Sequence, residues 1–426
     1  MVERANAPEI RFAGFTDPWE QRKLGDCFDF LQNNTLSRAD LNLESGSARN
    51  IHYGDILIKF GDCLGLGSDK LPFVDDESIL SKYVNSTLRV GDIIFADTAE
   101  DESAGKCVEL VELPNEPVIS GLHTIPVRPK FPFGSGYLGH YLNAPAYHDQ
   151  LLPLMQGVKV ISVSKTTLQD TQICFPTVSE QSAIGASLNA LDFLITLHQR
   201  KHGKLVQLKK SMLDKMFPKP GETEPEIRFA GFTDPWEQRK FSDMYEVNNE
   251  RNTDCEFGYD RTLSIATMTF NGGNGAADDS LNSYKVIRVG DIAFEGHANK
   301  VHAYGRFVLN DAGDGLMSPR FSCLRPIVEQ RYSFWKYYIS HEETMRSILV
   351  NATKSGTMMN ELVPDDLMRE SILVPCLAEQ EVIGDSLSQL DSLIALHQRE
   401  PGFTDTGYMR VERALMTMSM SLFSSS

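Results

Sequence analysis

The spacing of apolar residues changes along the chain, and the change separates two kinds of structure. Short alternating or β-branched runs, interrupted by Gly, Pro, Asn and Asp, fill most of the sequence and predict strands and turns. The clearest runs lie at residues 56–60, 90–95, 158–163 and 286–294. From residue 181 the period becomes that of a helix. We therefore expect an α+β fold in which mixed units are each followed by a long helix.

Residues 181–217 carry a heptad repeat of apolar and histidine side chains. One row consists of Ile184, Leu191, His198, Leu205 and Met212, and the other of Leu188, Ile195, His202, Lys209 and Met216. No proline interrupts the repeat, and a helix over this range would be about 55 Å long. The apolar rows of so long a helix require a partner, although an ordinary long core helix would give the same pattern.

The chain contains two copies of one sequence frame. Residues 8–23 read PEIRFAGFTDPWEQRK, and residues 225–240 are identical to them. Two further blocks recur, which are RVGDI at residues 89–93 and 288–292, and a longer match of residues 176–200 with residues 375–399. The longer block includes a Glu-Gln pair and ends on Leu-His-Gln-Arg in both copies. Such a repeat predicts two structural units of the same kind.

The second copy repeats the helix and thereby supplies its partner. The equivalent apolar and histidine positions are Ile383, Leu387, Leu390, Ile394 and His397. We expect the two helices to pair as an antiparallel coiled coil with pseudo-twofold symmetry and to hold the two units at a fixed separation. The expected seam consists of Ile184, Leu188, Leu191, Ile195, Leu205, Ile383, Leu387, Leu390 and Ile394.

Between the shared blocks the two copies diverge. The first has HYGDILIKFGDCLGLGSDK and FADTAEDESAGK, whereas the second has TMTFNGGNGAADDS and FEGHANKVHAYGRF. A common scaffold with different loops is expected if each copy recognises a different ligand. A duplication whose loops drifted without function is the alternative.

Composition restricts the class of protein. The net charge is −17, from 41 basic and 58 acidic residues, so basic partners would have to supply part of any contact with phosphates. The seven cysteines include no Cys-x-x-Cys pair, which favours reduced thiols over a zinc or redox site. No signal peptide precedes the first copy, and no apolar run approaches the length of about 18 residues that crosses a membrane. We expect a cytoplasmic protein with no membrane contact.

His198 and His202 lie one turn apart on the predicted helix, a spacing that also occurs in metal sites. Gln199 and Arg200 follow His198, so the HExxH pattern is not met. We interpret both histidines as seam or solvent-facing residues and expect no metal. Residues 200–219 are basic and could follow phosphates or dock an acidic partner, or they could form a solvated helix face.

Together these landmarks resemble the specificity subunits of type I restriction enzymes. The resemblance rests on the tandem layout, on PWEQRKL and PWEQRKF at residues 18–24 and 235–241, on P-x-x-x-EQ-x-x-I-G from Pro176 and Pro375, and on the L-x-x-LD-x-LI-x-LHQR ending of each helix. It implies five segments. These are target recognition domains at residues 1–179 and 220–378, a central helix and linker at 180–219, a distal helix at 379–400, and a divergent, weakly ordered tail at 401–426.

The resemblance also implies a function. Such a subunit is non-catalytic and reads a bipartite, asymmetric site in double-stranded DNA. It assembles with two methyltransferase (modification) subunits, which bind S-adenosylmethionine and methylate adenine. Restriction subunits, which use ATP and Mg to translocate and cut DNA, complete the enzyme. No cofactor is expected in this chain itself.

After Arg399 the second copy departs from the first. The first continues through KHGKLVQLKKSMLDKMF after Arg200, whereas Glu400, Pro401 and Gly402 should end the second helix. The tail matches nothing in the first copy. We therefore expect a shortened bundle, in which the distal helix lacks the half that would cover residues 205–216.

Reading DNA bases requires hydrogen-bond donors and acceptors on exposed loops. In the second copy the candidates are His297, Asn299, Lys300, His302 and Arg306, with Lys354 and Ser355 further along the chain. The corresponding stretch of the first copy, residues 97–106, is acidic, and its candidates are Asp97, Thr98, Glu100 and Lys106. A polar loop that does not touch DNA is the alternative for each of these residues.

Two other classes of protein stay open. A self-contained DNA-modifying or DNA-cleaving enzyme would need its own catalytic motif, but the nearest methyltransferase-like string, NAPAY at residues 143–147, lacks the paired proline, and no P-loop is present. A repeat scaffold that binds only proteins would show binding that is insensitive to salt, whereas DNA affinity should fall steeply with salt.

Overall fold

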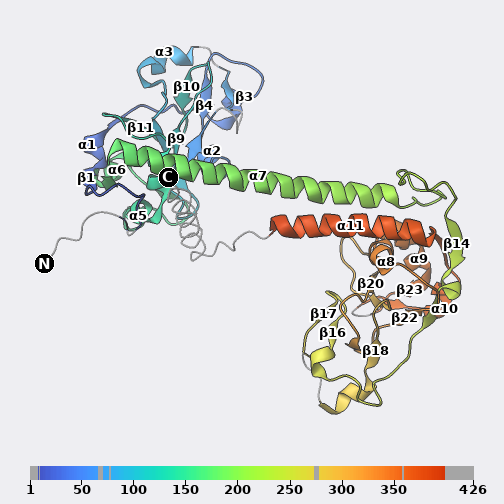
Figure 1. Cartoon of the computed structure of the whole chain (residues 1–426). Coiled ribbons are helices and arrows are strands. Elements are labelled where there is room, and N and C mark those ends of the chain that lie inside the picture. The colour runs from blue at the N-terminus through green and yellow to red at the C-terminus, as the bar shows by residue number, and fades with distance from the viewer. Residues whose placement is uncertain are drawn as a thin grey trace. The chain divides into compact units, whose positions relative to one another are not determined.

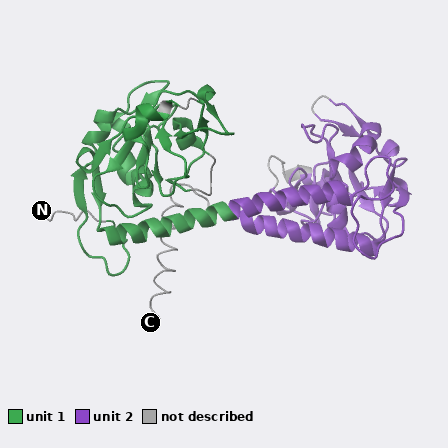
Figure 2. Ribbon diagram, turned by 90° about the horizontal axis from the view of Figure 1, so that it is seen from above, with its two compact units in different colours: residues 1–197, 409–426 green, residues 198–408 purple. Residues whose placement is uncertain are grey.

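The computed structural model describes residue 8 and residues 10–65, 71–75, 78–272, 278–356 and 359–398. The described residues divide into two compact units, unit 1 up to Leu197 and unit 2 from His198 (Figure 2). Each unit combines small β-sheets with helices, which confirms the α+β expectation (Figure 1). The tail at residues 401–426 lies outside the described residues, and so do Arg399 and Glu400.

Unit 1 opens with a strand and closes with the start of a long helix. Its elements are β1 (Glu20–Lys23), α1 (Leu24–Cys27), β2 (Phe28–Phe30), η1 (Arg38–Asp40), β3 (Leu41–Asn42), β4 (Arg49–Ile51), α2 (Tyr53–Ile58), β5 (Cys63–Leu64), β6 (Phe73–Val74), α3 (Ile79–Tyr83), η2 (Val84–Ser86), β7 (Ile93–Ala96), β8 (Thr98–Ala99), β9 (Cys107–Leu110), β10 (Val118–Ser120), β11 (Thr124–Pro129), α4 (Tyr137–Asn143), α5 (Pro145–His148), η3 (Leu152–Leu154), β12 (Ile161–Ser162), α6 (Lys165–Asp170), β13 (Gln172–Phe175) and α7 (Val178–Met216).

A five-stranded sheet in the order β2-β11-β7-β9-β5 forms the centre of unit 1, beside a four-stranded sheet in the order β10-β4-β6-β3. All four residues of β7 are buried. Because successive strand residues face opposite sides, Ile93 and Phe95 enter one hydrophobic cluster, and Ile94 and Ala96 enter another. The central sheet is therefore covered on both faces.

Unit 2 contains the end of α7 and repeats the plan of unit 1. Its further elements are β14 (Glu237–Lys240), η4 (Phe241–Asp243), β15 (Tyr245–Val247), η5 (Tyr259–Arg261), β16 (Leu263–Ser264), β17 (Thr269–Phe270), η6 (Asp278–Ser283), β18 (Lys285–Ile287), β19 (Ile292–Glu295), β20 (Arg306–Leu309), β21 (Gly315–Met317), β22 (Cys323–Pro326), α8 (Tyr332–Tyr338), α9 (Glu342–Ala352), β23 (Thr353–Lys354), β24 (Glu361–Leu362), α10 (Pro364–Leu367), β25 (Ser371–Val374) and α11 (Leu377–Gln398).

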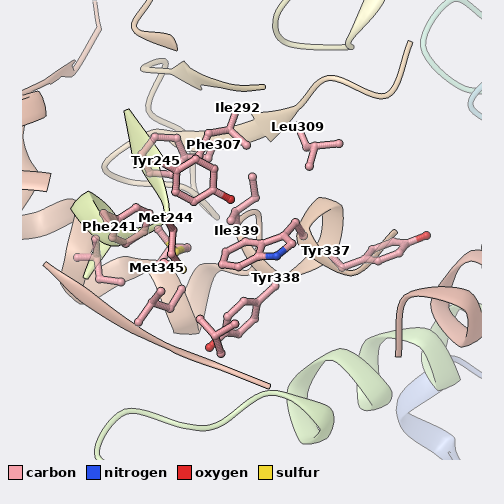
Figure 3. Close-up of a cluster of buried hydrophobic side chains, with 14 of the residues drawn as sticks. Phe241, Met244, Tyr245, Ile292, Phe307, Leu309, Tyr337, Tyr338, Ile339 and Met345 are labelled. Carbon is pink, nitrogen blue, oxygen red and sulfur yellow. The ribbon is translucent and has the colours of Figure 1, made fainter. Parts of the chain in front are cut away.

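The central sheet of unit 2 has the order β15-β22-β19-β20. An aromatic core packs against it, and Phe307, Tyr245 and Tyr338 are prominent in this core (Figure 3). As in β7, the residues of β19 divide between two clusters, with Ile292 and Phe294 in the aromatic core and Ala293 in a smaller one. The equivalent strands β7 and β19 therefore each contribute side chains to two hydrophobic clusters.

The shared blocks of sequence meet one another inside each unit. The EQRK of the first block forms β1 and pairs antiparallel with β13, which precedes α7, and the second EQRK forms β14 and pairs in the same way with β25, which precedes α11. The start and the end of each unit are therefore joined by one two-stranded sheet.

A bidentate ion pair reinforces each of these closures. Arg11 donates to both carboxylate oxygens of Glu180 at 2.8 and 2.5 Å, and Arg228 binds Glu379 in the same way at 2.9 and 2.7 Å. Both glutamates are buried, so their charges require these partners. This pairing explains why the arginine and the glutamate are shared by the two copies.

The glycine of the I-G motif lets each long helix approach the preceding short helix. A Cβ atom at Gly185 would overlap the backbone at Ser135 and Tyr137 beside α4, and one at Gly384 would overlap Ser333 and Phe334 of α8. Only a residue without a side chain permits this contact between the helices.

The aspartate of RVGDI makes a third contact that the two copies share. Asp92 accepts hydrogen bonds from the backbone of Arg89 and from the side chain of Arg128. Asp291 does the same for Arg288 and Arg325. These residues hold the turn before β7 and β19, so the shared string is structural in both copies.

The helices α7 and α11 are in contact within unit 2. The Nδ1 atoms of His198 and His397 face each other at 3.3 Å, and Lys209 Nζ lies 2.5 Å from Asp391 Oδ1. Since a later residue of α7 meets an earlier residue of α11, the two helices run antiparallel.

The expected seam residues differ in burial. On α11, Ile383, Leu387, Leu390 and Ile394 are all buried. On α7, Leu205 is half-buried in unit 2, and Ile184, Leu188 and Leu191 are half-buried in unit 1. Ile195 is 38% exposed.

The expectation that residues 205–216 would lack cover is wrong for the end of the helix, although Leu208 is 48% exposed. Met212 and Leu213 pack on the aromatic core that contains Met216, Ile383 and Leu387. In the antiparallel pair, the described part of α11 lies along the end of α7 that follows His198.

The run at residues 56–60 is also not a strand. Residues Tyr53–Ile58 form α2, where the imidazole of His52 accepts a hydrogen bond from the Gly54 amide. Ile56 is fully buried and Ile58 is 85% exposed, whereas a strand would place both on one face. The other runs contain β7, β12, and the pair β18 and β19, which are separated by the RVGD turn.

Two alanine substitutions in α7 should change stability in opposite directions. Gly185→Ala places a methyl group against the backbone of unit 1 and should lower the free energy of unfolding by about 1–3 kcal/mol. Gly203→Ala meets nothing within 4 Å and should raise it by about 0.5–1 kcal/mol, since alanine favours the helix. Urea unfolding of both variants measures the change in the free energy of unfolding. Changes of the same sign in the two variants would contradict the close approach at Gly185.

Candidate nucleic-acid interface

The candidate residues of unit 2 lie in the connection between β19 and β20. His297 is exposed, and its Nδ1 lies 2.5 Å from Glu295 Oε1. Its Nε2 is left for another contact, because no hydrogen bond to that atom occurs within the described part of the chain. Lys300 is also exposed and has no ion pair among the described residues.

Three other candidates in this connection have internal contacts. Asn299 Oδ1 accepts hydrogen bonds from the amides of Val301 and His302 and thereby forms the turn. His302 pairs with Glu342 at 3.0 Å, and Arg306 donates to the carbonyl of Ala266. These residues shape the loop, whereas the Nε2 atom of His297 and the Lys300 ammonium have no hydrogen bond or ion pair with a described residue.

The structure brings the remaining candidates of unit 2 to the same place. Lys354 and Ser355 are exposed and begin the β23–β24 hairpin. Asn360, just before β24, donates its backbone amide to the carbonyl of Gly296 and its side-chain amide to the carbonyl of Ala303. Two segments that are distant in the sequence therefore form one surface.

The candidates of unit 1 are held differently. Asp97 lies 3.3 Å from His123 Nδ1 and accepts a hydrogen bond from Thr98, which itself pairs with β12. Glu100 is exposed. The Lys106 ammonium donates to the carbonyls of Leu57 and Phe60 at the end of α2, so contact with DNA would require breaking these bonds.

Sequence analysis missed His123 and Tyr53, whose rings meet edge to face at 5.3 Å beside Asp97. His123 has a backbone φ of 56°, a conformation that is uncommon for a residue with a side chain and is frequent at functional sites. Nothing in the spacing links these residues to Asp97, because the sheet pairing of β11 with β7 brings them together.

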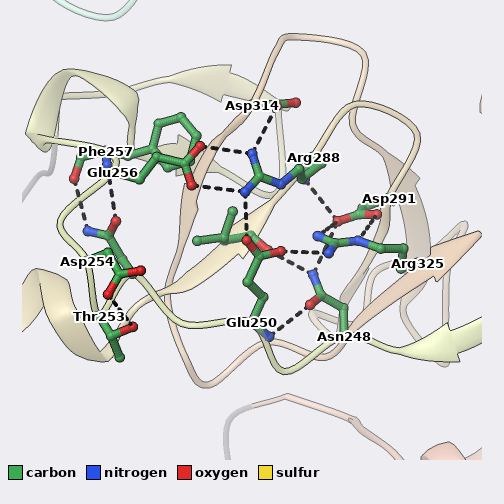
Figure 4. A network of polar contacts seen from close by, with 12 residues as sticks. Asn248, Glu250, Thr253, Asp254, Glu256, Phe257, Arg288, Asp291, Asp314 and Arg325 are labelled. Atoms are coloured by element: carbon green, nitrogen blue, oxygen red, sulfur yellow. Dashed lines mark hydrogen bonds and ion pairs between the residues drawn. The ribbon is translucent and has the colours of Figure 1, made fainter.

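Many cations of unit 2 are already neutralised. Arg288 pairs with Glu250, Glu256 and Asp314, and Arg325 pairs with Glu250 and Asp291 (Figure 4). Burial alone would raise the pKa of Glu250, but hydrogen bonds from the two arginines lower it overall. This network stiffens the unit and leaves these arginines unavailable to phosphates.

Comparison with known proteins agrees with this architecture. No family model matches the chain. A protein of Methanocaldococcus jannaschii, described as a type I restriction enzyme MjaX specificity subunit, is 22% identical over 98% of the chain and 97% of its own length. The crystal structure of a type I restriction-modification S subunit from M. genitalium covers 95% of the chain and 96% of its own, with 11% identity and a TM-score of 0.52, which shows a shared fold.

The chain is thus similar over nearly its whole length to a protein described as a type I restriction enzyme specificity subunit, and its fold is similar to that of a solved S subunit. Among the described residues, every helix is too short or too polar to cross a lipid bilayer.

Outside the candidate loops, the described residues of the chain include one cluster of side chains of the kinds that bind metal ions. Asp62, His140 and Asp192 place one ligand atom each within 4.8 Å of one another. His140 Nδ1 lies 3.0 Å from Asp62 Oδ2, and Nε2 lies 2.9 Å from Asn189 Oδ1. Both ring nitrogens face acceptors, so the arrangement suits a protonated imidazole and is satisfied without an ion.

This environment changes the titration of His140. Burial lowers its pKa, but the hydrogen bonds to Asp62 and Asn189 outweigh burial, and the pKa lies above its usual value. In unit 2 the equivalent place is taken by Tyr337, whose hydroxyl donates to Asp391 at 2.6 Å. A histidine in unit 1 and a tyrosine in unit 2 therefore fill equivalent places beside the long helix.

We predict that His140 makes the stability of the protein depend on pH. Because its pKa is raised by folding, its contribution is fully present below about pH 6.5, the unfolded value, and is lost as pH rises through the folded value. His140→Gln should flatten the fall of the melting temperature above pH 6.5. Tyr337→Phe, the matched control in unit 2, should change stability without changing that slope, and an unchanged slope for His140→Gln would contradict the prediction.

Proposed function

We propose that this chain is the specificity subunit of a type I restriction-modification complex. In this proposal it reads a bipartite, asymmetric site in double-stranded DNA and directs adenine methylation and DNA restriction by partner subunits. One observation supports this most strongly. The residues that the two copies share are used in internal contacts, whereas the equivalent connections after β7 and β19 carry unlike side chains. A repeated frame with unlike exposed loops is what two different half-sites require.

The candidate base-reading residues are part of this proposal. In unit 2 we favour His297 and Lys300, with Lys354 and Ser355 beside them, because these groups are exposed. In unit 1 we favour Asp97, Thr98 and Glu100, since carboxylates and hydroxyls can accept hydrogen bonds from base amino groups. Asn299, His302, Arg306 and Lys106 would act indirectly, through the loop shapes that they hold.

The paired helices would set the distance between the two reading domains. We propose an antiparallel coiled coil with pseudo-twofold symmetry, and the meeting of His198 with His397, which are equivalent residues of the two copies, supports it. The domain limits of residues 1–179 and 220–378, with helices at 180–219 and 379–400, belong to this proposal. Half-sites about one turn of DNA apart are readable by such a pair.

The partners follow from the same proposal. Two methyltransferase subunits would carry S-adenosylmethionine, and restriction subunits would carry ATP and Mg, in the cytoplasm and without membrane contact. The net charge of −17 fits this division, because basic partners would contribute phosphate contacts that the specificity subunit does not make alone.

Exchange of the interior of one copy tests modular reading. Replacing residues 242–374 with the corresponding interior of another specificity subunit, and co-expressing the product with the modification subunit, should change one half of the methylated sequence. The matched exchange of residues 25–175 should change the other half. Methylome sequencing reports both results, and a change of both halves by either exchange would reject the proposal.

Activity of the purified chain distinguishes the other classes. Methyl transfer or DNA cleavage without partners would indicate a self-contained enzyme. Partner binding that is insensitive to salt, with no affinity of the complex for DNA, would indicate a protein-binding scaffold.

A further inference from the structure

A short hairpin of unit 1 carries apolar side chains that are exposed and not packed in the core of the unit. Gln156 and Ser162 exchange backbone hydrogen bonds at 3.1 and 2.8 Å, and residues 157–160 form the tip. Val158 is 98% exposed and Val160 is 54% exposed. Lys159 between them is exposed and forms no ion pair with any described residue. Single exposed valines are common, but two that flank a free lysine on a protruding tip form a defined contact surface.

The hairpin is built firmly, although its tip is exposed. Gly157 has a φ of 119°, and a Cβ atom there would overlap the carbonyl of Val160, so the turn requires glycine. Leu151 before the hairpin and Val163 after it are buried in the core of unit 1. The tip therefore has a fixed shape, which lowers the entropic cost of inserting it into a partner.

The position of the hairpin indicates what it contacts. Its second strand, β12, pairs with β8, so that Ser162 lies opposite Thr98, and Val163 donates its amide to the carbonyl of Asp97. The tip thus adjoins the segment of unit 1 that we propose to read bases.

Unit 2 has the same arrangement at the same point in the order of elements. There the β23–β24 hairpin bears the exposed Lys354, and its Asn360 binds the connection between β19 and β20. In each unit a hairpin that carries a lysine accompanies the variable loop, although the sequences of the two hairpins are unrelated.

We propose that the hairpin at residues 156–162 enters a groove of double-stranded DNA, an inference that rests on the proposed function. The major groove admits a two-stranded β-ribbon, and apolar side chains there contact thymine methyl groups. Val158 and Val160 make these apolar contacts, and the Lys159 ammonium pairs with a backbone phosphate. The hairpin complements the acidic loop beside it, which has no free cation of its own among its described residues.

The test uses the full chain in complex with its modification subunits and a duplex that contains the methylated sequence of the wild type. Lys159→Gln should weaken binding about threefold to tenfold and should reduce the slope of log K against log salt by about 0.9, the value for one phosphate contact. The double variant Val158→Ser, Val160→Ser should weaken binding by a similar factor and leave the slope unchanged, since it removes no charge.

Matched controls lie at the opposite end of β7. Val90 is a valine with 60% exposure in the turn before β7, and Lys130 is an exposed lysine that follows β11. Val90→Ser and Lys130→Gln should leave affinity and salt slope unchanged. Thermal unfolding should show all variants folded, because every substituted side chain lies at the surface.

The outcomes separate this inference from the proposed function. Wild-type binding that is specific and salt-dependent, with hairpin variants equal to their controls, would overturn the hairpin inference alone. Loss of assembly with the modification subunits would also overturn it, because the tip would then contact protein. A wild-type complex without specific DNA affinity would reject the proposed function itself.

Discussion

The antiparallel pairing of the first and last strands of each unit is the constraint on which the rest of the structure depends. It ties β1 to β13 and β14 to β25, and in both units a buried glutamate at the start of the following helix accepts a bidentate contact from an arginine before the first strand. Since a buried carboxylate without its partner is costly, the helix cannot leave the unit without breaking this pair. Each unit therefore delivers its long helix at a defined point.

This closure frees the interior of the sequence to vary. The residues between the first and last strands need only fill the core and lead the chain back to the last strand. The two copies fill their cores with different side chains. Phe307, Trp335 and Tyr338 build an aromatic core in unit 2, whereas unit 1 uses a polar cluster around the buried His140 at the place of Tyr337. Exposed loops can change in such a fold without disturbing these internal contacts.

The charged side chains divide in the same way between the shared frame and the variable loops. Internal ion pairs engage Arg288, Arg325 and Arg128. These pairs stiffen the frame, and they leave the three guanidinium groups unavailable to a phosphate. Near the variable loops, Lys159, Lys300 and Lys354 are exposed and form no ion pair with a described residue. Under the proposed function, a chain with a net charge of −17 would present local positive charge on the loops proposed to meet DNA.

The amino-acid sequence by itself determined the duplication, the α+β character and the existence of two helices that pair antiparallel, because these depend on repeats and on local periodicity. Only the tertiary structure decided that residues 56–58 belong to a helix, that Met212 and Met216 pack in the aromatic core of unit 2, and that Lys106 is bound to carbonyl groups. The joining of His123 to Asp97 and of the 156–162 hairpin to β8 likewise required the structure. These features arise from contacts between residues that are far apart along the chain, and hydrophobic period and motif spacing carry no information about such contacts.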